Sequence, residues 1–120
     1  MARILVIDDQ ESIRRVMRRA LTLDGHEILE ASEGEAGVAL LASRGADLVI
    51  TDIFMPGQDG IVTLREIRKR FPAVKVMVIS GGDETGLMDL RHDAELLGAV
   101  TSLPKPFDAK ELLEAVRAIL

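Results

Sequence analysis

Cysteine, tyrosine and tryptophan are absent from this chain of 120 residues, and phenylalanine occurs only three times. Without cysteine there are no disulfides and no thiolate metal sites, so the fold must be held by its apolar core, as suits a reducing compartment. No apolar run approaches the ~20 residues that cross a bilayer. Met1-Ala2-Arg3 leads into a predicted strand without the pattern of a signal peptide. These absences favour a cytoplasmic protein with no membrane partner.

Positive charge is also scarce. The chain carries 15 lysines and arginines against 20 aspartates and glutamates, a formal net charge of −5. Nucleic acid is therefore not expected as a direct partner, because phosphate binding needs clustered cations. The main cationic group is a set of four arginines at helical spacing, Arg14, Arg15, Arg18 and Arg19. It is either a solvated helix face or a surface on which a partner docks.

Short apolar runs alternate with amphipathic helical patterns along the chain, which is typical of βαβ units and a parallel sheet. The length is that of a single domain, which buries roughly two thirds of its unfolded surface. We predict five strands, approximately at Arg3–Ile7, Glu27–Ala31, Asp47–Thr51, Lys75–Ser80 and Val100–Leu103.

Five helices are expected between and after these strands. Capping boxes are predicted at Ser32-Glu33-Gly34-Glu35 and Asp108-Ala109-Lys110-Glu111, at the starts of the second and last helices. The third helix is expected from Asp59-Gly60 to Phe71-Pro72, and the fourth from about Glu84 to Leu97. The first helix ends near Gly25, and its buried stripe is predicted to be Ile13, Val16, Met17, Ala20 and Leu21.

Polar side chains follow four of the predicted strands where each strand ends. They are Asp8 and Asp9, Asp52, Ser80 and Lys105. The carboxyl ends of parallel strands meet at one edge of a sheet, where open α/β folds bind their ligands. Three carboxylates in a partly dehydrated pocket repel one another unless a cation is present, and oxygen ligands favour Mg²⁺ over zinc.

A Mg²⁺ ion beside an ammonium and a hydroxyl suits a phosphoryl group. Because no serine or histidine lies among the acids, a carboxylate would be the acceptor. Taken singly, the same residues have structural explanations. Asp8 and Asp9 could cap a helix, Asp52 could precede the turn at Met55-Pro56-Gly57, and Ser80 could be a turn residue. Their joint placement at strand ends favours a site.

Several motifs follow one another along the chain. They are Ile7-Asp8-Asp9, Asp52 with Met55-Pro56-Gly57 and Asp59-Gly60, Ile79-Ser80, Gly98-Ala99 and Lys105-Pro106-Phe107. With these motifs, the chain from Arg3 to Leu120 resembles the receiver domains of two-component response regulators, single-domain chemotaxis regulators included. The resemblance implies one receiver domain over residues 1–120, with a flavodoxin-like, doubly wound, five-stranded parallel sheet of order 2-1-3-4-5. It also implies a cis peptide bond between Lys105 and Pro106.

The resemblance further implies the roles of the site residues. Asp52 would be the phosphoacceptor, and Asp9, Asp52 and the Phe54 backbone carbonyl would bind Mg²⁺, with Asp8 acting largely through water. The Ser80 hydroxyl and the Lys105 ammonium would contact the phosphoryl group. The donor would be a histidine kinase or phosphotransfer protein, and an unknown downstream protein or output domain would receive the signal. Such a receiver, a monomer or weak dimer, is a signalling module that assists only its own phosphorylation and dephosphorylation.

The chain departs from the family at the fifth strand, where Ser102 stands in place of the usual tyrosine or phenylalanine. Without this ring, the signal is expected to travel through the glycine-rich segment 81–86 and the fourth helix. Phe54, apolar where the family is often polar, either slows the loss of the phosphoryl group or simply packs on its loop. His26 and His92 are expected to lie away from the acids.

Other functions fit these residues less well than a phosphoacceptor receiver does. A nucleotide-binding domain would need a glycine-rich turn where Asp8-Asp9-Gln10 stands. A haloacid-dehalogenase-type phosphatase would separate its two aspartates by one residue. The closer alternative is a receiver-like interaction module that works without phosphorylation. The sequence does not decide whether the natural chain continues into an output domain.

Overall fold

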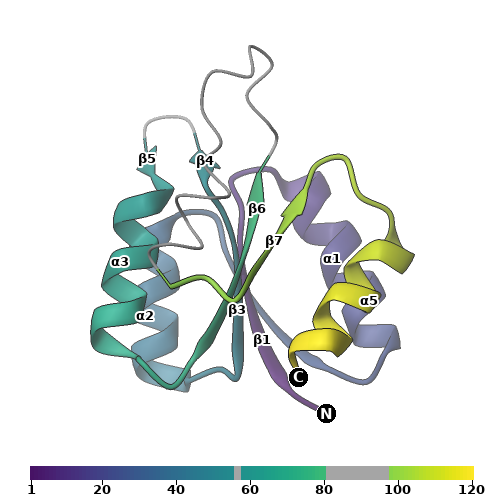
Figure 1. Cartoon of the computed structure of the whole chain (residues 1–120), viewed down its shortest axis with the longest axis horizontal. Helices are drawn as coiled ribbons and strands as arrows, with labels where there is room; N and C mark the ends of the chain where they lie inside the picture. Colours follow the sequence, from purple (N-terminus) through teal and green to yellow (C-terminus); the bar gives the residue numbers. More distant parts are fainter. Residues whose placement is uncertain (56–57, 81–97) are drawn as a thin grey trace.

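The computed structural model describes residues 1–55, 58–80 and 98–120. Five parallel strands form one sheet in the order β2-β1-β3-β6-β7 (Figure 1). Numbered along the chain, this order is 2-1-3-4-5, so the predicted flavodoxin-like sheet is confirmed. The strands are β1 (Arg3–Ile7), β2 (Glu27–Ala31), β3 (Leu48–Asp52), β6 (Lys75–Ser80) and β7 (Thr101–Pro104).

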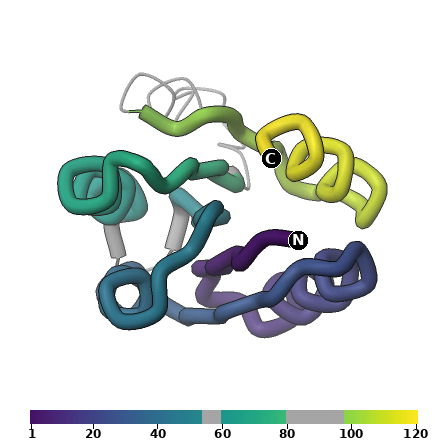
Figure 2. Tube along the Cα trace, turned by 90° about the horizontal axis from the view of Figure 1, so that it is seen from below, coloured from purple at the N-terminus to yellow at the C-terminus, as the bar shows by residue number. Residues whose placement is uncertain are grey.

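Helices cover both faces of the sheet. In the described part of the chain, α1 (Glu11–Leu23) and α5 (Ala109–Ile119) lie on one face, and α2 (Gly34–Arg44) and α3 (Gly60–Arg70) lie on the other (Figure 2). The predicted fourth helix, the glycine-rich segment 81–86 through which the signal is expected to travel, and His92 fall outside the described residues. None of the helices in the described ranges is long and apolar enough to cross a bilayer.

The predicted boundaries are exact for β1, β2 and β6 and differ by one residue for β3 and β7. Strand β3 reaches Asp52 because the backbone of this residue pairs with Ile79. Strand β7 reaches Pro104, which is tolerated there because β7 is an edge strand. A short antiparallel pair, β4 (Phe54–Met55) and β5 (Gln58–Asp59), was not predicted.

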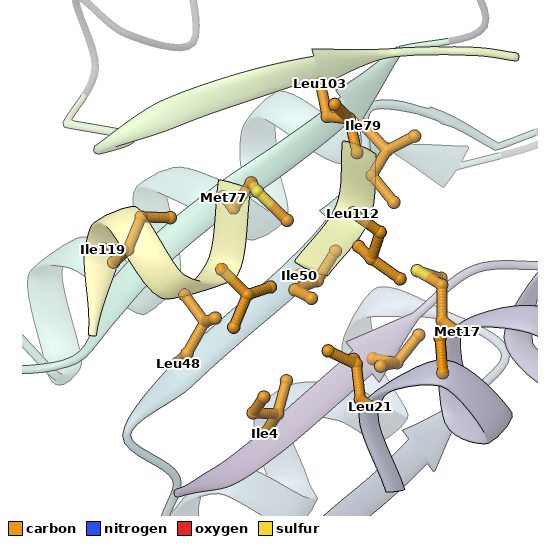
Figure 3. Packing of buried hydrophobic residues seen from close by; sticks show 13 residues of the cluster. Ile4, Met17, Leu21, Leu48, Ile50, Met77, Ile79, Leu103, Leu112 and Ile119 are labelled. Carbon is orange, nitrogen blue, oxygen red and sulfur yellow. The ribbon is translucent and has the colours of Figure 1, made fainter. Parts of the chain in front are cut away.

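The core has two apolar layers, one on each face of the sheet. Along β1, Leu5 and Ile7 belong to the layer under α2 and α3, while Ile4 and Val6 belong to the layer under α1 and α5. Figure 3 shows the second layer, in which side chains from α1 and α5 meet those of the central strands. All of β3 is buried, as expected for a strand covered on both faces.

The sequence predictions for the helix ends and for the buried face of α1 were partly correct. The capping box of α5 is confirmed, since Asp108 accepts from the Glu111 amide at 2.8 Å and Glu111 accepts from the Asp108 amide at 3.2 Å. The predicted box of α2 is wrong, because the cap is the extended residue Glu33, one residue later, and it makes no side-chain cap bond. In α1, Val16 is 46% exposed and lies beside the buried stripe rather than in it.

Candidate functional site

Three carboxylates meet at the carboxyl edge of the sheet, the edge formed by the C-terminal ends of its strands. Asp8 and Asp9 directly follow β1, and Asp52 ends the neighbouring strand β3. One carboxylate oxygen from each residue lies within 4.8 Å of those of the other two. Asp8 is fully buried and Asp52 is 2% exposed, whereas Asp9 faces solvent. The structure therefore brings together the three acids singled out from the sequence.

Lys105 follows the edge strand β7 and reaches into this acid cluster. Its Nζ donates to Asp52 Oδ2 at 2.8 Å and to Asp8 Oδ2 at 3.1 Å, and its side chain is 15% exposed. The peptide bond between Lys105 and Pro106 is cis, as predicted. Burial lowers the pKa of Lys105, but the hydrogen bonds and negative charges of Asp52 and Asp8 outweigh it and raise the pKa above the usual 10.5. The ammonium therefore stays charged at neutral pH.

Asp8 is fixed by its neighbours at every polar group. Its amide donates to the Ala31 carbonyl at 3.1 Å, and its Oδ1 accepts from the Gln10 amide at 2.9 Å. Its carbonyl accepts from Nη1 of Arg14 at 2.6 Å. Sequence reasoning placed Arg14 only in a cationic helix face and missed this contact.

The cationic face of α1 is largely paired within the chain. Arg14 and Arg18 both reach Glu30 of β2, at 3.5 and 2.7 Å, and Arg15 lies 3.7 Å from Glu11 one turn earlier. The sequence signal for these ion pairs was the negative charge of Glu30 on β2. It could be used only once the register of β1 and β2 was known.

For two other predicted site residues, Ser80 and Phe54, the structure gives the position of the backbone. Ser80 ends β6 and pairs in register with Pro104, and Phe54 begins β4 two residues after Asp52. The roles of the Ser80 hydroxyl and the Phe54 carbonyl stay predictions. His26 lies before β2 at the opposite edge of the sheet, where its Nδ1 accepts from the Ala2 amide at 3.1 Å.

The donor set at the carboxyl edge suits a hard divalent cation. Among the described residues it consists of carboxylate oxygens without thiolate or imidazole, the set that Mg²⁺ prefers. In the described part of the chain, one ammonium, that of Lys105, lies beside these three carboxylates, which leaves an excess of negative charge. Because Asp9 is exposed, one side of the cluster is open to the waters that Mg²⁺ retains.

Known proteins of similar sequence are bacterial response regulators. Response regulator MprA of Mycolicibacterium vanbaalenii is 36% identical over 118 residues, which cover 98% of this chain and 50% of that protein. Transcriptional regulatory protein CpxR of Klebsiella pneumoniae is 37% identical over 120 residues, which cover 100% of this chain and 50% of that protein. The chain thus spans about half the length of these relatives.

Solved structures of similar fold include a response regulator receiver domain protein from Clostridium thermocellum, with a TM-score of 0.87 and 35% identity over 98% of this chain and 93% of that one. Chemotaxis response regulator CheY4 of Vibrio cholerae has a TM-score of 0.89 over 100% and 99% of the two chains, and its 24% identity supports the fold alone. A sequence model of the response regulator receiver domain matches residues 4–117. The chain therefore belongs to the response regulator receiver domain family of two-component signalling.

Proposed function

We propose that residues 1–120 form one receiver domain that takes a phosphoryl group on Asp52 from a histidine kinase or a phosphotransfer protein. Phosphorylation would change its binding to a downstream protein or output domain, in the cytoplasm, as a monomer or weak dimer. The observation that carries the proposal is the position of Asp52. Its carboxylate lies 2.8 Å from the Lys105 ammonium and beside Asp8 and Asp9.

In the proposed reaction, a carboxylate oxygen of Asp52 attacks the phosphorus of a phosphohistidine. The new O–P bond forms as the P–N bond breaks, and the electron pair stays on the imidazole nitrogen, which then takes a proton. Lys105 already faces this carboxylate and would pair with the incoming phosphoryl oxygens. The Ser80 hydroxyl would contact the same group.

Asp9, Asp52 and the Phe54 carbonyl would hold Mg²⁺, with Asp8 contributing largely through water. When bound, the ion would neutralise charge on the transferred phosphoryl group. Asp8, fixed by Gln10, Ala31 and Arg14, would keep the metal side of the cluster in place.

The test is phosphorylation by acetyl phosphate and Mg²⁺, read by intact-protein mass spectrometry. The wild-type protein should gain one phosphoryl group, and Asp52→Asn should gain none. Asp47→Asn is the matched control at the other end of β3. Asp47 accepts from the Arg3 amide at 2.9 Å, a bond that an asparagine oxygen can keep. Wild-type labelling in Asp52→Asn would contradict the assignment.

Ser102 supports a second candidate, an interaction module that works without phosphorylation. It lies in β7 in register with Val78, at the position where a switching ring is usual in the family. A folded wild-type protein that stays unlabelled by acetyl phosphate and by kinases would favour this module over the phosphoacceptor.

A further inference from the structure

Arg14 lies next to the acid cluster without contacting any of its carboxylates. Its guanidinium, on a side chain only 17% exposed, donates from Nη1 to the backbone carbonyl of Asp8 at 2.6 Å. Its Nε is 3.5 Å from Oε1 of Glu30. Arg14 thus joins three elements, because it is on α1, Glu30 is on β2 and Asp8 follows β1.

The carbonyl that Arg14 holds belongs to the peptide unit that joins Asp8 to Asp9. This unit is planar, so a hydrogen bond to its oxygen also fixes the direction of the Asp9 amide. The amide and both carboxylate oxygens of Asp8 are already bonded, to Ala31, Gln10 and Lys105. The hydrogen bond from Arg14 therefore holds the backbone in one orientation where it leads into Asp9, although Asp9 itself is exposed.

Glu30 gives Arg14 its own orientation. This carboxylate is 26% exposed and receives two arginines, Arg14 at 3.5 Å and Arg18 at 2.7 Å. Its strand neighbour in register is Val6, whose side chain lies in the apolar layer under α1, so Glu30 is on the same face as α1. Arg18 shares the partner of Arg14 but has no recorded bond to the Asp8–Asp9 turn among the described residues.

We propose that Arg14, oriented by Glu30, is a positioning residue that sets the Asp8–Asp9 peptide so that Asp9 and Asp8 can serve one divalent cation together with Asp52. For the identity of the ion as Mg²⁺, this inference rests on the proposed function. Residues that orient metal ligands typically change affinity 10- to 100-fold when removed. We expect Arg14→Ala to weaken Mg²⁺ binding about tenfold.

The sign of this effect separates positioning from simple electrostatics. Arg14 is a cation near a cation site, so its charge alone opposes Mg²⁺ binding. If charge were its only contribution, Arg14→Ala would bind Mg²⁺ more tightly than the wild type. Weaker binding in Arg14→Ala is expected only if the arginine holds the ligands in place.

The experiment is a titration with MgCl₂ followed by amide chemical shifts, on the wild type, Arg14→Ala and Arg18→Ala. Arg18→Ala is the matched control, because it removes an arginine from the same Glu30 and should stay within about twofold of the wild type. Glu30→Gln, which keeps the size and an oxygen acceptor, should weaken binding in the same direction as Arg14→Ala. Equal or tighter binding in Arg14→Ala, or an equal loss in Arg18→Ala, would overturn the proposal.

A second readout needs neither metal nor phosphorylation. The Gln10 amide, bonded to Asp8 Oδ1, reports on the turn through its hydrogen exchange in EDTA. It should exchange about tenfold faster in Arg14→Ala, with Ile50 in β3 unchanged as a monitor of the fold, and no faster in Arg18→Ala. Unchanged Gln10 exchange in Arg14→Ala would contradict the positioning role. A wild type that takes up no Mg²⁺ would contradict the proposed function, and Gln10 exchange would then decide the role of Arg14 alone.

Discussion

At Lys105, one ammonium meets two carboxylates that are almost completely shielded from water. Charges in such surroundings are tolerated only when they are paired and hydrogen-bonded. The bonds of 2.8 and 3.1 Å to Asp52 and Asp8 meet this need for both acids at once. In the proposed reaction the same ammonium would pair with the phosphoryl group, so one residue would serve both stability and function.

We predict that Lys105→Met lowers the free energy of unfolding by roughly 3 kcal/mol at pH 8 in EDTA, because it leaves two buried carboxylates without their cation. Urea unfolding followed by circular dichroism measures this change. Lys110→Met is the matched control, since Lys110 is exposed on α5 and its loss should cost little. Equal stability of the two variants would contradict the prediction.

The same proteins have a pH signature. The pKa of Lys105 is raised in the folded state, so its stabilisation is fully present below its unfolded value of about 10.5 and is lost as pH rises through the higher folded value. The stability gap between the wild type and Lys105→Met should therefore stay constant from pH 7 to 9 and shrink above about pH 10.5.

Single residues differed in how far the sequence could predict them. Asp8, Asp52 and Lys105 were found because each follows a recognisable strand, and strand ends converge in a parallel sheet. The contact of Arg14 with Asp8 could not be found in this way. It depends on the rotation of α1 over the sheet and on Glu30, which a pattern of charges does not specify.

Among the described elements, α3 begins beside the site. A Cβ added to Gly60, the first residue of α3, would lie 2.4 Å from the Ile53 carbonyl oxygen and 2.5 Å from its Cα. Ile53 follows Asp52 and donates its amide to the Ile79 carbonyl at 3.0 Å. Glycine thus lets the start of α3 rest on the backbone next to the proposed phosphoacceptor.

We predict that Gly60→Ala destabilises the protein by about 1–3 kcal/mol, because backbone cannot move aside for the added methyl group. Helix propensity alone would give the opposite sign. Gly37→Ala is the comparison, since its Cβ would meet side-chain atoms of Ile7, at 2.4 and 2.7 Å, rather than backbone, and it should cost less. Urea unfolding of both variants tests the order, and a more stable Gly60→Ala would contradict it.

Strands of five or six residues were predictable, and strands of two residues were not. Strands β1, β2 and β6 have five or six residues of clear pattern and were located exactly. The pair β4 and β5 has two residues in each strand, too few for a periodic signal. The cap of α2 was misplaced because Ser32 and Glu35 fit a capping box in sequence, while the backbone makes Glu33 the cap.

For the molecule as a whole, the apolar core and the acid cluster lie in different parts of the sheet. Two apolar layers bury the strands on both faces, and three carboxylates lie close together at the carboxyl edge. Asp8 and Asp52 share the Lys105 ammonium and Asp9 adds a third carboxylate beside them, so the metal-free fold retains repulsion among like charges. A bound divalent cation would relieve this repulsion and couple metal binding to global stability.

We therefore predict that Mg²⁺ stabilises the wild type by about 2.7 kcal/mol at a free concentration 100 times its dissociation constant. Asp9→Asn should lose most of this gain, since it removes a proposed ligand, and should be more stable than the wild type in EDTA, since it removes a repelling charge. Asp47→Asn, at the opposite end of β3, should keep the Mg²⁺ gain. Thermal unfolding followed by circular dichroism, with MgCl₂ and with EDTA, measures all three proteins. An Asp9→Asn protein that gains as much from Mg²⁺ as the wild type would show that Asp9 is not a ligand.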